Sequence, residues 1–226
     1  MRARETFIAV INVLRTLQDA QLLYFYQLPV LSRTGNVEMV SWPNAYADSG
    51  YSDDTTFASL VQYRRSLLES SYLAILRDGT IIKGFYAFKH NKLVKHSLWY
   101  WPCPFAIPDE DIMQETPLGA LELYSNSWEK YVRFRTPMRF DYHPEAAKDG
   151  HPASHLHMQS PECRIAVERP LGFASFVRFV FRNFHQEYWE QTDIWNDLTD
   201  ELDDKEKSCL AKSDIWLQHI GWKRPL

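Results

Sequence analysis

The chain has 226 residues, of which 45% are hydrophobic and 15% aromatic, so it has ample side chains for a packed core and disorder is expected only in short loops. Its net charge of -4 disfavours a protein that coats nucleic acid non-specifically. No apolar run approaches the roughly 20 residues of a bilayer-spanning helix, and three scattered cysteines without a Cys-x-x-Cys pair favour a reducing compartment. We therefore expect a cytoplasmic protein with no membrane partner, folded as a single α+β domain over residues 1–226.

The first quarter of the chain predicts two helices separated by a loop. Apolar residues at three-and-four spacing predict an opening helix over residues 3–27, ended by Pro29. Residues 29–54 are rich in Ser, Asn, Asp, Gly and Pro, which indicates a long loop with one short strand at 37–40. A second helix, capped by Asp53 or Asp54, is expected to follow.

The clearest local signal is a tight hairpin. Two β-rich runs, residues 72–76 and 80–88, flank Arg77-Asp78-Gly79, where glycine accepts a positive φ. Residues 93–101 continue as a third strand, and Pro102 removes the donor needed to extend it. Three strands in an antiparallel meander are predicted.

The second half predicts further strands followed by helices. We expect an irregular connection over residues 104–127 and a strand over residues 130–143 that bends at Pro137. Two short extended segments are expected at residues 154–158 and 164–167. An aromatic-rich helix over residues 170–184 and an acidic helical tail over residues 187–226 should then follow. The fold class is therefore α+β: an antiparallel meander sheet packed by the N-terminal helix and the aromatic-rich C-terminal helix, with a helical tail.

The histidines indicate where a site could lie, because five of the eight fall between His143 and His185. His155 and His157 share one face of their strand, since side chains at i and i+2 point the same way. Pairing with the preceding strand would bring its polar residues to the same spot. The candidate catalytic residues are His155, His157, His143 and Asp141, and the candidate substrate-binding residues are Arg139, Arg164 and Tyr142.

Such a cluster suits acid–base catalysis, metal binding or recognition of a phosphate. His155, His157 and Glu162 reproduce the His-x-His-x4-Glu spacing of the first metal motif of cupins. A cupin barrel needs further strands after this motif, whereas the residues after Pro170 predict a helix, so we expect no metal and no other cofactor. The competing interpretation is structural: one histidine donates to a backbone carbonyl, another is exposed, and nothing is catalysed.

In the acid–base interpretation, His155 and His157 transfer protons while Arg139 or Arg164 holds an anionic substrate. Bases outnumber acids between residues 130 and 182, which favours RNA or another phosphate ester as substrate. Because RNA carries its own 2′-hydroxyl nucleophile, a metal-independent ribonuclease-like activity needs only proton transfer and charge stabilisation. The hypothesis requires both imidazoles to face one solvent-reachable hollow with an arginine in reach.

Several motifs together support a family resemblance: Arg77-Asp78-Gly79-Thr80, the strand ending Trp99-Tyr100-Trp101-Pro102-Cys103-Pro104, Met138-Arg139-Phe140-Asp141-Tyr142, His151-Pro152 with Ser154-His155-Leu156-His157, and the aromatic helix 173–184. This combination resembles an uncharacterised bacterial family that carries only a domain-of-unknown-function label, over residues 55–190, with the acidic tail outside it. The Arg-x-Asp pair followed by His-Pro-x-x-His-x-His resembles, more distantly, small toxins of bacterial toxin–antitoxin pairs.

That resemblance implies a role in toxicity or phage defence and identifies no catalytic residue. RNA, or a protein encoded by a neighbouring gene, is the expected partner. The alternative from another class is a non-enzymatic subunit that docks other proteins through its aromatic and acidic surfaces.

Overall fold

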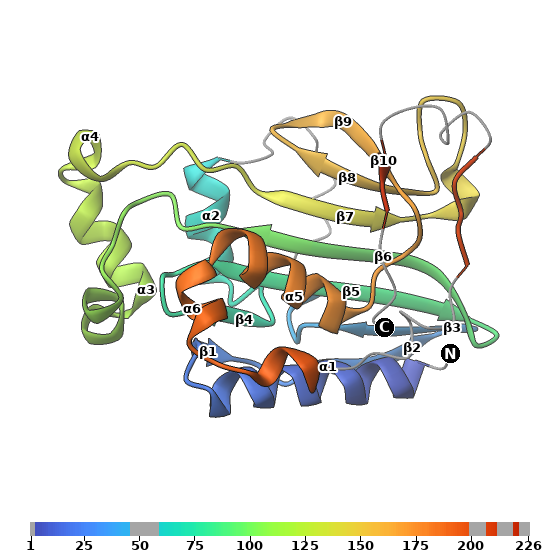
Figure 1. Ribbon diagram of the computed structural model, residues 1–226, viewed down its shortest axis with the longest axis horizontal. Coiled ribbons are helices and arrows are strands. Elements are labelled where there is room, and N and C mark those ends of the chain that lie inside the picture. The colour runs from blue at the N-terminus through green and yellow to red at the C-terminus, as the bar shows by residue number, and fades with distance from the viewer. Residues whose placement is uncertain (1–2, 46–58, 199–206, 212–218, 222–226) are drawn as a thin grey trace.

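A ten-stranded, mostly antiparallel sheet forms the centre of the computed structural model, which describes residues 3–45, 59–198, 207–211 and 219–221 (Figure 1). The strand order is β1-β4-β5-β6-β7-β8-β9-β10, and β2 pairs with β3, which in turn pairs with β5. Among the strands in the described residues, only β9 and β10 pair in parallel. The strands are β1 (Leu23–Tyr26), β2 (Val30–Thr34), β3 (Val37–Ser41), β4 (Ala74–Leu76), β5 (Ile81–Lys89), β6 (Lys92–Trp101), β7 (Met138–Tyr142), β8 (Ser154–Met158), β9 (Ser160–Val167) and β10 (His219–Ile220).

Helices pack on both faces of this sheet. They are α1 (Ala3–Asp19), α2 (Leu60–Leu68), α3 (Asp109–Ser125), α4 (Trp128–Tyr131), α5 (Phe173–Phe184) and α6 (Gln186–Glu190), with short 3-10 turns η3 (Pro144–Ala146) and η4 (Ile194–Asn196). Helices α1 and α5 contribute to one buried cluster and α2 and α3 to another. Figure 1 shows α5 lying across β5 and β6, and α3 with α4 at one end of the sheet. None of the helices in the described ranges has the length and apolar character to cross a membrane.

Strand β6 separates the two cores. Leu98 and Tyr100 pack in the cluster with α1 and α5, whereas Trp99 and Trp101 pack in the cluster with α2 and α3. This alternation follows from the two-residue period of a strand, and it explains why the strand is apolar on both sides. The face that carries Trp99 is the one on which the candidate site lies.

The α+β class and the meander are confirmed, because β5, β6, β7, β8 and β9 pair consecutively and antiparallel. The aromatic-rich helix is also confirmed as α5, whose apolar face is buried. The N-terminal helix is present but shorter than predicted. It ends at Asp19 because Gln21 adopts a φ of 57°, and residues 23–26 then pair as β1 with β4.

Two connecting segments contain more regular structure than predicted. The short strand predicted at 37–40 is confirmed as β3, and β2 pairs with it in a hairpin whose turn uses Gly35 at a φ of 61°; residues 46–54 of this segment lie outside the described residues. Residues 104–127 contain α3, where Asp109, Glu110 and Asp111 in the first turn complement the helix dipole. Its periodicity was masked by a kink, because Thr116 has a φ of 68° just before Pro117.

Three predicted boundaries also change. Helix α2 begins after Ser59, whose hydroxyl accepts from the Gln62 amide at 3.1 Å, while Asp53 and Asp54 lie outside the described residues. The strand predicted over residues 130–143 is limited to β7, preceded by α4. The tail contains α6 and η4 as predicted helical turns, but its later described part is strand β10 beside β9; residues 199–206, 212–218 and 222–226 lie outside the described ranges.

Candidate functional site

Strand register brings the polar residues of β6, β7 and β8 together. Asp141 of β7 lies directly opposite His155 of β8, and Arg139 lies opposite His157. On the other side of β7, Asp141 lies opposite Ser97 of β6. Residues two apart on a strand share a face, so these side chains form adjacent rows on one face of the sheet.

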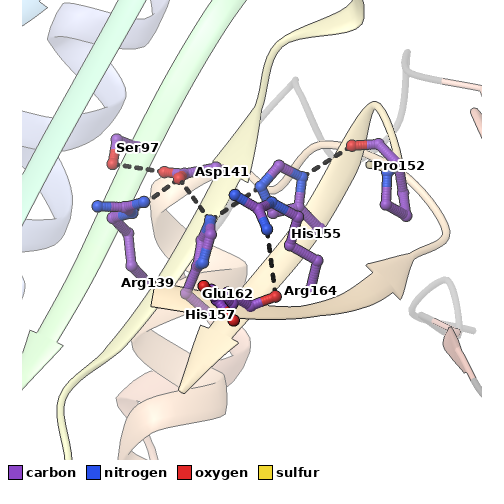
Figure 2. Close-up of polar contacts among 8 residues, drawn as sticks. All are labelled: Ser97, Arg139, Asp141, Pro152, His155, His157, Glu162 and Arg164. Atoms are coloured by element: carbon purple, nitrogen blue, oxygen red, sulfur yellow. Dashed lines mark hydrogen bonds and ion pairs between the residues drawn. The ribbon is translucent and has the colours of Figure 1, made fainter. Parts of the chain in front are cut away.

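The Asp141 carboxylate is the hub of the resulting network (Figure 2). Its Oδ1 accepts from the Ser97 hydroxyl at 2.7 Å, and its Oδ2 accepts from Arg139 Nε at 2.7 Å. His157 Nε2 lies 3.3 Å from the same Oδ2. The Arg139 guanidinium carbon also lies 4.8 Å from the centre of a Trp99 ring, so this arginine is fixed on both sides.

The two imidazoles meet through their Nε2 atoms, which are 2.9 Å apart. His155 Nδ1 lies 2.8 Å from the Pro152 carbonyl oxygen, which can only accept, so Nδ1 carries the proton in neutral His155. Nε2 of His155 is then an acceptor, and His157 Nε2 is the donor between the two rings. The hydrogen-bond network thus assigns one tautomer to each histidine.

Electrostatics keeps Asp141 ionised and His155 neutral. Burial alone would raise the pKa of Asp141, but the hydrogen bond from His157, the Arg139 charge and the Ser97 hydrogen bond outweigh it and hold this pKa well below its usual range. Burial lowers the pKa of His155 to about 4, against the opposing effect of the Asp141 charge. At neutral pH the site therefore contains a fixed carboxylate and an uncharged imidazole.

His155 and His157 converge, but each is only 2% exposed, so these two rings do not face the solvent-reachable hollow that the catalytic hypothesis requires. The more accessible member of the cluster is His151, whose ring centre lies 4.8 Å from that of His155 in an edge-on contact. Its pKa is lowered, first by partial burial and then by the charge of Arg164. A row of side chains therefore runs from buried Asp141 through His157 and His155 to His151 at the surface.

The other predicted residues divide between the two faces. Arg164 of β9 is on the site face, because Ala166, two residues on, pairs with His155. Its Nη1 donates to the Glu162 carbonyl at 3.2 Å (Figure 2). Tyr142 lies on the opposite face, where its ring stacks on His96 at 5.8 Å.

His143 is likewise not brought into the network. Its backbone amide donates to Ala153 at 2.8 Å, but its side chain makes no hydrogen bond or ion pair with the cluster in the described part of the chain. Arg139, predicted to hold substrate, is engaged with Asp141 and Trp99 instead. Its position suits orientation of the carboxylate better than contact with a ligand.

Sequence reasoning missed three members of the site: Ser97, Trp99 and His151. Ser97 and Trp99 belong to a strand more than 40 residues away, so only the β6–β7 register reveals them. His151 was visible in the same histidine-rich stretch, eight residues after His143. The turn that returns it to His155 was the missing information.

Asp141, His155 and His157 could also hold a metal ion, because one donor atom from each lies within 4.8 Å of the others. The Nε2 separation of 2.9 Å is near the roughly 3.3 Å edge of a tetrahedron with zinc–nitrogen bonds of about 2.0–2.1 Å. The Nδ1 contact of His155 with a carbonyl is typical of ligating histidines. The Arg139 charge on the same carboxylate oxygen opposes a cation.

The third donor is therefore Asp141 and not the Glu162 of the cupin-like spacing. Glu162 is exposed and is not part of the convergent group. Helix α5 follows this motif, as expected for a fold that is not a cupin barrel.

Comparison with known proteins identifies a family that covers most of the chain. The family model for an uncharacterized conserved protein, DUF2290, matches residues 22–222. This range includes most of the acidic tail, which the sequence resemblance had placed outside the family, and it provides no link to toxins. No curated protein and no solved structure matches the chain.

Proposed function

We propose that this chain, which belongs to the DUF2290 family of uncharacterized conserved proteins, is an enzyme that acts on RNA or another phosphate-bearing substrate at the row formed by Asp141, His157, His155 and His151. The observation that supports this is the continuity of the row: a buried, ionised carboxylate is connected through two hydrogen-bonded imidazoles to a third at the surface beside Arg164. In many active sites a second residue orients the nucleophile or base, and a third residue orients the second.

On RNA, the proposed reaction is an intramolecular transesterification. The 2′-hydroxyl attacks the adjacent phosphorus, the bond from phosphorus to the 5′-oxygen breaks, and a 2′,3′-cyclic phosphate forms. His151, as the accessible imidazole, takes the 2′-hydroxyl proton, and Arg164 stabilises the charge on the phosphate oxygens. The leaving 5′-oxygen takes a proton from a water molecule, and the hydroxide that remains removes from His151 the proton of the 2′-hydroxyl, so that protons balance over the step. The imidazole of His151 is positioned by the buried residues behind it, which are Asp141, His157 and His155.

Cleavage of a labelled single-stranded RNA by the full chain, in buffer with EDTA, tests the proposal. His151→Ala and His157→Ala should each lower the rate by about 100-fold or more, the range for loss of a general acid or base. His90→Asn, in the β5–β6 turn, is the matched control and should cleave normally. Because His151 is partly exposed, its variant should fold even if His157→Ala does not. Cleavage that neither substitution lowers would overturn the proposal.

A metal-dependent reaction at the same residues is the second candidate, favoured by the convergence of three donor atoms. In that case Asp141, His155 and His157 hold a divalent ion, and the ion supplies an activated water. Metal content after zinc addition and dialysis separates the two candidates. About one zinc ion per chain, lost in Asp141→Asn but kept in His90→Asn, together with activity abolished by EDTA, favours the metal. Full activity in EDTA favours proton transfer by the imidazoles alone.

At the level of the cell, the proposal is a cytoplasmic role in toxicity or phage defence. Expression in a bacterial host should arrest growth, and His155→Ala with His157→Ala together should restore it. The alternative is a non-enzymatic subunit that binds a protein from a neighbouring gene. Purification only as a complex with that neighbour, with growth arrest unchanged in the double variant, favours the subunit.

A further inference from the structure

A polar cavity lies at the end of the sheet, and none of the residues of the histidine row lines it. It has a volume of about 450 Å³ and is lined from four separate segments: Asp78 of the β4–β5 turn, residues 106–109 before and at the start of α3, Arg133 with Arg135, and residues 184–188 at the α5–α6 junction. This volume falls within the roughly 300–1,000 Å³ of small-molecule sites.

His185 in the cavity wall is a buried polar group with an unsatisfied atom. It is 6% exposed, and its Nε2 has no hydrogen-bond partner in the described structure. Its Nδ1 lies 3.6 Å from Asp78 Oδ2, and its ring stacks on Tyr188 at 5.9 Å. An unpaired buried polar atom costs roughly 1–3 kcal/mol. Nε2 itself has almost no exposed surface, so in this structure it is covered and does not face a ligand in the cavity.

The rim of the cavity carries two arginines and one exposed aromatic ring, and the same lining includes the carboxylates of Asp78, Asp109 and Glu187. Arg133 is exposed and forms no ion pair with a described residue, and Arg135 reaches Asp78 only at 3.7 Å. Phe184 of the cavity wall is 41% exposed. Two guanidinium groups beside an accessible aromatic ring suit a phosphate attached to a flat base, since guanidinium pairs with phosphate and bases stack on aromatic rings.

We propose that this cavity binds a nucleotide unit, either a free nucleotide or the terminal nucleotide of a single-stranded RNA. The phosphate lies at the rim on Arg133 and Arg135. The base stacks on Phe184 and presents its edge to Asp78 in the cavity wall. Residues 132–137 lead from this rim into β7, which carries Arg139 and Asp141. The binding is a property of the cavity itself and does not depend on catalysis at the histidine row.

Isothermal titration of the full chain with AMP, UMP and inorganic phosphate tests the inference, and fluorescence polarisation with a labelled single-stranded RNA tests the second source. We expect saturable one-site binding of at least one nucleotide or of the RNA, and much weaker binding of phosphate alone. Arg133→Glu and Phe184→Ala should each weaken that binding at least 10-fold. Both side chains are exposed, so neither variant should lose its fold.

Matched controls make the same chemical changes elsewhere on the surface. Arg33→Glu removes an exposed arginine of β2, and Phe25→Ala removes a 48%-exposed ring of β1. Both should bind as the unchanged chain does. Binding of nucleotide identifies a free ligand, and binding of RNA without nucleotide identifies a strand end. The inference is overturned if neither binds at millimolar concentration, or if the control variants weaken binding as much as Arg133→Glu and Phe184→Ala.

Discussion

Replacement of Asp141 by Asn tests whether the carboxylate holds the site together. The substitution keeps the size of the side chain but removes the charge that pairs with Arg139 at 2.7 Å and accepts from Ser97 at 2.7 Å. The Arg139 and Asp141 side chains are only 13% and 18% exposed, so water replaces the lost partner poorly. Breaking one partner of a buried pair costs roughly 3–5 kcal/mol, and this residual exposure favours the lower end, about 3 kcal/mol.

The assay is equilibrium urea unfolding at pH 7, supported by thermal unfolding. For a chain of this size, 3 kcal/mol corresponds to a fall in Tm of about 6–12 °C. Glu162→Gln, an exposed carboxylate on neighbouring β9, is the control and should stay within roughly 0.5 kcal/mol. In a double-mutant cycle, Arg139→Met with Asp141→Asn should lose about 2 kcal/mol less than the sum of the single losses. An Asp141→Asn chain as stable as the unchanged protein would refute this reasoning.

Two further predictions concern stability away from the site. Gly79→Ala should destabilise the fold by roughly 2–4 kcal/mol, because φ is +81° and the new Cβ would lie 3.2 Å from both Ile112 Cδ1 and the Tyr63 hydroxyl. Gly35→Ala, at φ +61° in open space, should destabilise it by only about 1 kcal/mol. Equal losses of stability in urea unfolding would contradict the role of crowding at Gly79. Burial lowers the pKa of His96 to about 4, so the unfolded chain binds a proton first as pH falls below 6.5. The stabilisation from neutral His96 is complete above pH 6.5 and declines towards pH 4, and the loss reaches about 2 kcal/mol at pH 5. In urea unfolding measured at several pH values, His96→Gln should therefore show a smaller loss of stability between pH 6.5 and pH 4.

Strands and helices whose apolar residues repeat at one regular spacing could be predicted from the sequence. Elements in which that spacing is interrupted, or continues the spacing of a neighbouring element, could not. In residues 72–101, alternating apolar residues and an Asp-Gly turn predict the hairpin and the third strand. The aromatic face of residues 173–184 predicts α5. Helix α3 was missed because Pro117 and the kink at Thr116 interrupt its pattern. Strand β1 was absorbed into the opening helix, because its apolar residues happen to continue the helical spacing.

The same contrast holds for the candidate site. Asp141, His155 and His157 could be placed on one face from their spacing, because one strand pair determines their geometry. Ser97 and Trp99 could not, because pairing between β6 and β7 spans a connection that contains two helices. Burial of the histidines is also a tertiary property, and it is the reason that the proposed mechanism assigns the contact with substrate to His151.

A chimeric oligonucleotide tests the central claim most directly. An all-ribose strand is compared with one that carries a single 2′-deoxy sugar at the cleavage position, both with full-length protein and EDTA. Because the proposed mechanism uses the 2′-hydroxyl as nucleophile, the ribose strand should yield a 2′,3′-cyclic phosphate and the substituted position should resist cleavage. Equal cleavage of both strands, or of neither by folded protein, would contradict proton transfer at the histidine row.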